Sequence, residues 1–286
     1  MADDGGRTAD DPFELVVASA TPVGPSLVRV ELAGADLARY APLGSSDEAA
    51  VLHVPMPDGE QDPRGRWYTI CDLLDGPFGR RLVVELVTHE GGVGASWARR
   101  ARAGDRVVIS TRSSWFRRPA DATWQILLGD VAALPAISRI VAESPSGTQT
   151  VAVVEVPEPG DARELSGAQV SWVHRPHLAA GSGLAELARH QNLLTDVPDG
   201  PGYIYVAGEA AATRAVRRML RHELGLPPSA YGVIGYWRID AERWIRRYEQ
   251  SADTYEQIWA DAESSGRDDE EILDIYEARL AEAGLL

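Results

Sequence analysis

The segment Arg66-Trp67-Tyr68-Thr69 decides how the rest of this chain is interpreted. Residues two apart on a strand share a face, so Arg66 and Tyr68 can contact one ligand while Thr69 acts through its backbone and hydroxyl. A guanidinium binds pyrophosphate in a bidentate manner, and an aromatic ring packs flat against a planar group. An ordinary barrel strand with an exposed arginine is the competing interpretation, so the motif needs support from its surroundings.

The surroundings are rich in short β-type segments. Apolar and β-branched runs are separated by turns of Gly, Pro and Asp, which is typical of antiparallel strands. We predict a six-stranded antiparallel β-barrel over residues 12–118, preceded by a disordered acidic tail at 1–11. The predicted strands are 13–19, 26–33, 49–55, 66–71, 80–88 and 105–110.

After Pro119 the pattern changes to alternating strands and helices, which predicts a doubly wound parallel α/β nucleotide-binding domain over residues 119–240. The predicted strands are 123–128, 149–156, 168–174, 203–207 and 231–235, and the predicted helices are 132–143, 183–192 and 209–224.

Residues 241–286 form a C-terminal helical extension in this interpretation. Aromatic residues recur at helical spacing, and Asp268 with Glu271 forms a capping box, so we expect two amphipathic helices. We expect their aromatic stripe to pack against the sheet or a second subunit rather than a cofactor.

Composition excludes several classes of function. A net charge of −15 argues against nucleic acid or an anionic membrane as partner and favours small molecules. The chain contains no lysine, which excludes Schiff-base and P-loop chemistry. It has one cysteine, no metal-binding motif and no long apolar segment, so a cytoplasmic location without a metal site is the default expectation.

Further motifs follow in order along both predicted domains. They are His89-Glu90-Gly91-Gly92-Val93-Gly94-Ala95-Ser96-Trp97-Ala98, Leu127-Leu128-Gly129-Asp130, Ala133-Leu134-Pro135-Ala136-Ile137, Ala207-Gly208-Glu209 and Gly235-Tyr236-Trp237-Arg238. Together with the Arg66 motif, this set resembles the siderophore-interacting protein family, flavin-dependent reductases of ferric chelates in the ferredoxin-reductase superfamily.

The resemblance implies a flavin-dependent NAD(P)H oxidoreductase that reduces a ferric siderophore or similar ferric chelate. It implies FAD contacts from Arg66, Tyr68, Thr69, His89, Gly92, Gly94, Ala95 and Ser96. It implies NADH or NADPH contacts from Gly129, Asp130, Leu134, Pro135, Gly208 and Glu209. Thr69, Tyr236 and Trp237 would act at the flavin, and Arg238 would attract the chelate.

Each motif also has a plainer interpretation. The glycine-rich segment could be a surface turn that caps a helix, and Glu209 could be a favourable charge at a helix start. Tyr236 and Trp237 could be core residues. The nicotinamide preference is open, because Glu155 would bind ribose hydroxyls and repel a 2′-phosphate, whereas Arg175 would attract one.

The chain departs from the family pattern at several positions. Cys71 stands where members carry a second arginine, and Val51 where many carry a lysine. Val131-Ala132 replaces a Glu-Thr pair, and Asp240 replaces a glycine. Two other functions therefore stay open: a flavin reductase that supplies a monooxygenase partner, and a non-redox biosynthetic enzyme such as a cyclase on the same scaffold.

Overall fold

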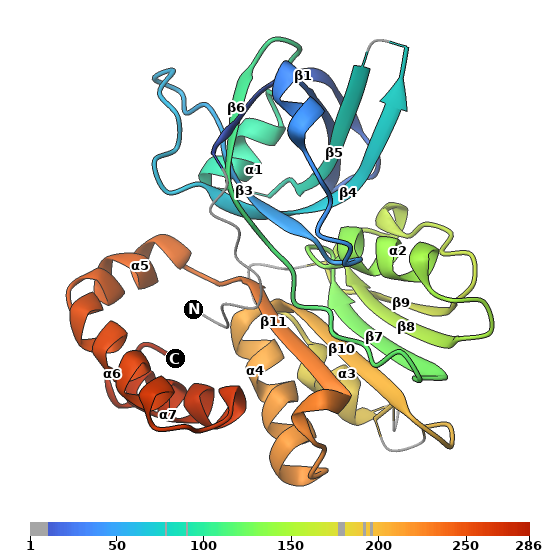
Figure 1. The fold of residues 1–286 in the computed structure, drawn as a ribbon, viewed down its shortest axis with the longest axis vertical. Coiled ribbons are helices and arrows are strands. Elements are labelled where there is room, and N and C mark those ends of the chain that lie inside the picture. Colours follow the sequence, from blue (N-terminus) through green and yellow to red (C-terminus); the bar gives the residue numbers. More distant parts are fainter. Residues whose placement is uncertain (1–10, 78, 90, 177–180, 191–192, 195–196) are drawn as a thin grey trace.

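A computed structural model describes residues 11–77, 79–89, 91–176, 181–190, 193–194 and 197–286. The predicted tail at 1–11 lies almost wholly outside the described residues. Figure 1 shows a β-barrel above an α/β layer, with an arc of helices beside the sheet. Among the described segments, no helix combines the length and apolar character needed to cross a membrane.

The barrel is closed and its neighbouring strands are antiparallel, as predicted. Alternation places Phe13, Leu15 and Val17 in its core, where Trp97 of the short helix α1 (Val93–Ala98) is fully buried. The strand order is β1-β2-β5-β4-β3-β6. The strands are β1 (Phe13–Pro22), β2 (Leu27–Ala33), β3 (Ala49–His53), β4 (Arg66–Gly76), β5 (Gly79–Val87) and β6 (Arg106–Ser113).

The second domain is a parallel five-stranded sheet of order β11-β10-β7-β8-β9, which confirms the doubly wound prediction. All seven residues of its central strand are buried, because helices cover both faces. Leu127 packs with α2 (Leu134–Glu143) on one face, whereas Ile126 and Leu128 pack with α3 (Leu184–His190) and α4 (Ala210–Arg218) on the other. The strands are β7 (Trp124–Asp130), β8 (Gln149–Val156), β9 (Gln169–His174), β10 (Gly202–Glu209) and β11 (Tyr231–Trp237).

The helices of this domain are α2 (Leu134–Glu143), α3 (Leu184–His190) and α4 (Ala210–Arg218), and α4 continues into a π-type turn at Met219–Glu223. The predicted helix 183–192 ends at residues that the structure does not describe.

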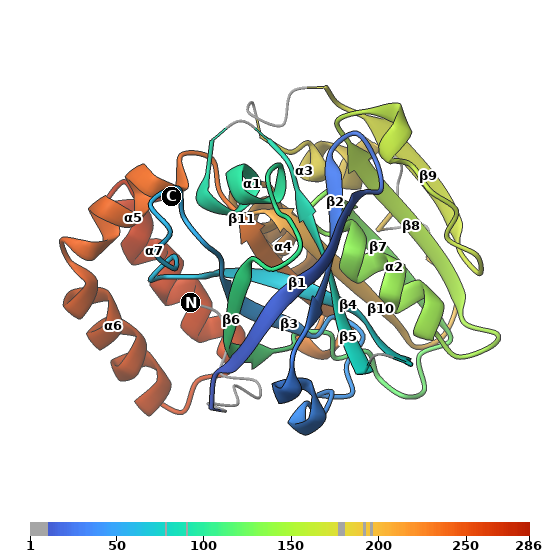
Figure 2. The same ribbon diagram turned by 90° about the horizontal axis from the view of Figure 1, so that it is seen from above.

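The extension contains three helices, so the prediction of two is wrong. They are α5 (Ala241–Glu249), α6 (Ala252–Ser264) and α7 (Asp269–Glu282). Ser251 has a φ of −140°, which interrupts the aromatic helical pattern between α5 and α6. The capping box at Asp268 and Glu271 is present. The aromatic residues form a separate cluster within the extension rather than packing on the sheet. Figure 2 shows the extension on one side of the barrel, opposite α2 and β9.

Candidate functional site

Thr69 and Tyr236 meet where the barrel faces the sheet. Thr69 lies on β4 and is 5% exposed, while Tyr236 lies near the end of β11. Burial, followed by the charge of Asp47, raises the pKa of Tyr236, although hydrogen bonds with Tyr205 and Thr69 oppose the shift. Two residues predicted to act together, 167 positions apart in the sequence, thus converge at one interdomain contact.

A buried network extends from this contact. The hydroxyls of Tyr205 and Tyr236 are 2.8 Å apart, and Tyr205 donates to Asp47 Oδ2 at 3.4 Å. The same Asp47 oxygen accepts the Trp115 backbone N–H at 2.8 Å. Burial raises the pKa of Asp47, which is fully enclosed, and backbone N–H donors oppose that rise. Residues of both domains thus hold Tyr236 in place.

Asp130 joins the carboxyl ends of three strands. Its Oδ1 accepts the Ala132 backbone N–H at 3.0 Å. Its Oδ2 accepts the Glu209 backbone N–H and the Trp237 indole N–H, each at 2.8 Å. Complete burial raises the pKa of Asp130 to about 6 despite these donors. Asp130 and Trp237, both predicted site residues, are therefore in direct contact.

The turns after β7 and β10 need glycine for close packing. A Cβ on Gly129 would lie 2.7 Å from Ala133 Cβ, and one on Gly208 would lie 2.5 Å from Asp130 Oδ2. Glu209 caps α4 by accepting the N–H groups of Ala211 and Ala212, which is the plainer of its two predicted roles. The remaining predicted contacts of this edge, Leu134 and Pro135, are buried at the start of α2.

The glycine-rich segment lies against β4. A Cβ on Gly94 would overlap the Tyr68 hydroxyl, so that ring packs over the first turn of α1. Gly92 adopts a φ of 74° beside the His89 ring, a conformation that favours glycine. Ala95 is buried, and Ser96 is half-buried one turn after Gly92. The structure thus brings together the residues of both predicted FAD motifs.

Arg66 already holds an anion. Its Nη2 lies 2.8 Å from Glu242 Oε1 of α5, and its Nε lies 3.4 Å from Asp62 Oδ2. A carboxylate with this geometry occupies donors that a phosphate would use. The Glu242 carboxylate at Arg66 takes the place that a phosphate would take. Together with the glycines beside Tyr68, it indicates that the residues present fit the anionic part of FAD.

At two positions where the family pattern carries a cation, this chain carries an uncharged side chain. Burial, then the charge of Glu85, raises the pKa of Cys71 to about 12, so a neutral thiol replaces a guanidinium. Val51 pairs with Trp67 across β3 and β4 and supplies no charge. Arg238 is engaged elsewhere: its guanidinium lies 4.5 Å from the Trp244 ring centroid and donates to the Leu285 carbonyl. Asp240, with a φ of 50°, begins α5.

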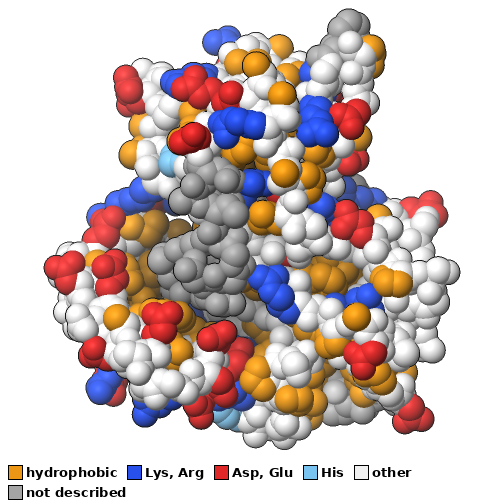
Figure 3. Space-filling model, in the orientation of Figure 1, with side chains coloured by type: hydrophobic (Ala, Val, Ile, Leu, Met, Phe, Trp, Pro, Cys, Tyr) orange, Lys and Arg blue, Asp and Glu red, His pale blue; other side chains and the backbone are white. Residues whose placement is uncertain are grey.

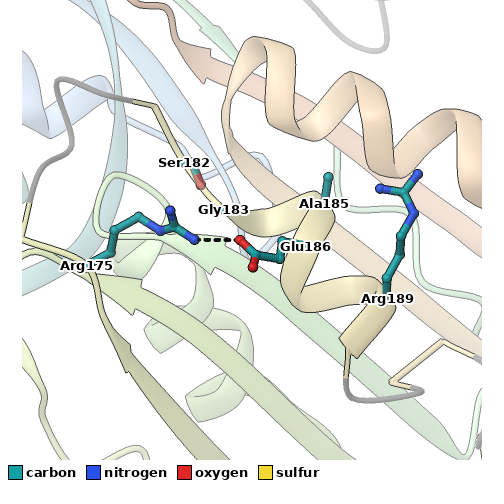
Figure 4. Close-up of a pocket in the computed structure, with 6 residues that line it drawn as sticks. All are labelled: Arg175, Ser182, Gly183, Ala185, Glu186 and Arg189. Carbon is teal, nitrogen blue, oxygen red and sulfur yellow. Dashed lines mark hydrogen bonds and ion pairs between the residues drawn. The ribbon is translucent and has the colours of Figure 1, made fainter.

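A pocket of about 510 Å³ lies beyond the carboxyl end of β9. Figure 4 shows Arg175 reaching across it to Glu186, with Arg189 on the far side of α3. The side chain of Glu155 is completely buried beneath, where its carboxylate accepts the Gly183 backbone N–H at 2.7 Å and lies 3.3 Å from Arg175 Nε. The pocket is lined by Arg175, Ser182, Gly183, Ala185, Glu186 and Arg189.

Asp47, Tyr205 and Glu242 were missed by the sequence-based interpretation. Asp47 lies two residues before β3, and Tyr205 alternates with Tyr203 in a buried strand, so both gave a weak signal. The pairing of Glu242 with Arg66 joins exposed charges 176 residues apart and has no sequence signal.

Two family models match this chain. The siderophore-interacting FAD-binding domain matches residues 47–113, and the siderophore-interacting protein model matches residues 122–240. Ferric vibriobactin reductase ViuB of Vibrio cholerae is 28% identical over 237 residues, covering 76% of this chain and 85% of that protein. The NADPH-dependent ferric-chelate reductase of Escherichia coli is 22% identical over 206 residues, covering 70% and 74%.

The crystal structure of a siderophore utilization protein from T. fusca is similar, with a TM-score of 0.67 and 27% identity. The similarity covers 81% of this chain and 96% of that one. These comparisons lend no support to a flavin reductase that serves a monooxygenase or to a cyclase.

Proposed function

Since this chain belongs to the siderophore-interacting protein family, we propose that it reduces ferric chelates with electrons from a pyridine nucleotide, using FAD. The contact between Thr69 and Tyr236 carries the proposal, because it joins the FAD-binding domain to the nucleotide-binding edge of the sheet. FAD, when bound, accepts a hydride from nicotinamide and releases electrons to ferric iron. The substrate is a ferric siderophore or a similar chelate, like those named for the two relatives.

In this proposal Arg66 binds the pyrophosphate, and Tyr68 covers the neighbouring part of the cofactor above Gly94. Thr69 and Tyr236 would both contact the flavin ring, one from each domain, and the buried position of Thr69 limits the access of water to it. The Asp47 network orients Tyr236 through Tyr205. Arg238, which packs on Trp244 and donates to the Leu285 carbonyl, would attract an anionic chelate through its charge.

For the pyridine nucleotide, the pocket beyond β9 is proposed to take the adenosine ribose, with a preference for NADPH. Glu155 is buried, accepts the Gly183 backbone N–H and pairs with Arg175, and its side chain is not part of the pocket lining. Arg175 and Arg189 do line it. A 2′-phosphate would replace the Glu186 carboxylate, which is 62% exposed, at Arg175.

The test is spectroscopic. Protein incubated with FAD and then freed of unbound flavin should be yellow and should bleach when NADPH is added without oxygen. A ferric chelate should then restore the colour, while a ferrous indicator reports iron reduction. Flavin that stays oxidised with both NADPH and NADH would contradict the proposal.

Replacing Arg175 by alanine tests the nucleotide preference. Loss of a charge-assisted bond to phosphate should raise KM for NADPH by roughly ten- to a hundredfold. KM for NADH should change little, because NADH has no 2′-phosphate, and stopped-flow flavin bleaching measures both. An equal loss with the two nucleotides would show that Arg175 supports the fold of the pocket instead.

A further inference from the structure

We propose that Glu242 of the C-terminal extension competes with the FAD pyrophosphate for Arg66 and thereby sets the affinity for FAD. The inference rests on the proposed function, in which Arg66 binds that phosphate. It assigns a role to an extension that lies beyond residues 47–113 and 122–240, the parts matched by the family models.

The competition follows from the donors that Arg66 offers. Its Nη2 donates to Glu242 at 2.8 Å, while Asp62, whose side chain is 5% exposed, lies behind its Nε at 3.4 Å. A guanidinium presents a planar fork of N–H donors that carboxylate and phosphate use in the same way. A bidentate pyrophosphate contact that uses Nη2 of Arg66 therefore requires Glu242 to leave that nitrogen.

Glu242 is able to leave. Its side chain is 50% exposed, and its second partner, Arg64, is 3.7 Å away. Such exposed pairs are individually weak. Figure 3 shows acidic and basic side chains next to one another where the extension approaches the barrel, in contact with solvent.

The helix that carries Glu242 is firmly held by its neighbours, although the Glu242 side chain itself can move. The Trp244 indole donates to the Leu285 carbonyl at 2.6 Å, and Tyr248 bonds to Tyr276 of α7. Arg217 of α4, whose side chain is 2% exposed, binds three carboxylates of α7. Glu242 therefore stays close to Arg66 after it is displaced.

Competition at Arg66 matters more in this chain because Cys71 stands where the family pattern carries a second arginine. A burial-raised pKa of about 12 keeps the thiol uncharged, so it cannot share the phosphate charge with Arg66. Arg66 thus works without the second arginine of the family pattern.

The test measures FAD dissociation constants of the flavin-free full-length protein by flavin fluorescence. Glu242→Gln should bind FAD about two- to fivefold more tightly, because an exposed ionic competitor is removed. Glu249→Gln is the matched control: it removes the same charge from the same helix but pairs with Arg64 at 2.6 Å, so FAD affinity should be unchanged. Arg66→Ala should weaken binding at least tenfold.

Each contrary outcome has a distinct meaning. Unchanged or weaker binding in Glu242→Gln, together with weak binding in Arg66→Ala, would overturn the competition and leave the phosphate role of Arg66 intact. Equal tightening by both glutamate variants would show a general charge effect and also overturn it. Normal FAD affinity in Arg66→Ala would overturn the phosphate role and the competition together.

Discussion

At the scale of single residues, Asp130 combines a structural task with a perturbed acidity. Three N–H donors from Ala132, Glu209 and Trp237 converge on its carboxylate and fix the ends of β7, β10 and β11. Burial raises the pKa of Asp130 by more than these hydrogen bonds lower it, so folding favours the protonated acid. The sequence placed Asp130 correctly at a strand end, but its partners come from distant segments.

Asp130 should therefore make stability depend on pH. Its pKa is about 6 in the folded protein against 3.8 in the unfolded chain, so its contribution is complete below pH 3.8 and is lost as pH rises through 6. Relative to Asp130→Asn, the wild-type free energy of unfolding should fall by about 2 kcal/mol between about pH 4.5 and about pH 7.5. Urea titrations at both pH values measure this, and parallel behaviour of the two proteins would contradict it.

Local spacing predicted the position of the candidate site residues on strands and helices, whereas their roles toward a cofactor stay predictions. Arg66 and Tyr68 lie two apart on β4, and the glycine-rich segment leads into α1, as period-two alternation and the glycine pattern predicted. Glu242 and Asp47 were not predicted from the sequence, because their contacts depend on which surfaces meet after folding. Periodicity contains no information about such contacts.

At the scale of elements, α7 is attached to α4 by matched charges. Arg214, Arg217 and Arg221 recur on one face of α4 and its π-type turn, opposite Glu270, Asp274 and Glu277 on α7. Arg217 lies at the centre and is almost completely buried. The extension thus depends on one guanidinium more than on its neighbours.

Replacing Arg217 by methionine should destabilise the protein by about 3–5 kcal/mol, because clustered carboxylates would lose a buried partner. Arg218→Met, at the exposed neighbouring position of α4, is the matched control and should change stability by less than about 0.5 kcal/mol. Chemical denaturation followed by circular dichroism compares them. Similar stabilities of the two variants would mean that the aromatic cluster alone holds the extension.

Element prediction succeeded for the barrel and the parallel sheet because period-two alternation and buried apolar runs are strong signals. It failed in the extension, where one continuous aromatic pattern covered α5 and α6. The break at Ser251 depends on its backbone conformation, and no neighbouring Gly or Pro predicts that break.

At the scale of the whole molecule, a single glutamate of the barrel links the two domains. Glu85 of β5 binds Arg29 of β2 and, through both carboxylate oxygens, Arg163 of the α/β domain. Burial favours protonation of Glu85, but Arg163 and then Arg29 outweigh it and hold its pKa below 4.5. Close by, Asp161 accepts the Ser26 backbone N–H at 2.8 Å, so the same loop is bound twice.

This arrangement predicts that Arg163 couples the unfolding of the domains. Arg163→Ala should cost about 1–3 kcal/mol and separate barrel unfolding from sheet unfolding in calorimetry, because a nearly enclosed carboxylate loses its interdomain partner. Arg29→Ala removes a bond to the same carboxylate within the barrel, so it should lower stability without separating the transitions.

Because the lowered pKa of Glu85 stabilises the protein above pH 4.5 and this contribution is lost as pH falls, Arg163→Ala should also be less acid-sensitive than the wild type. If Arg29→Ala separates the transitions equally, the coupling lies elsewhere in the interface, with the Asp47 network the next place to probe.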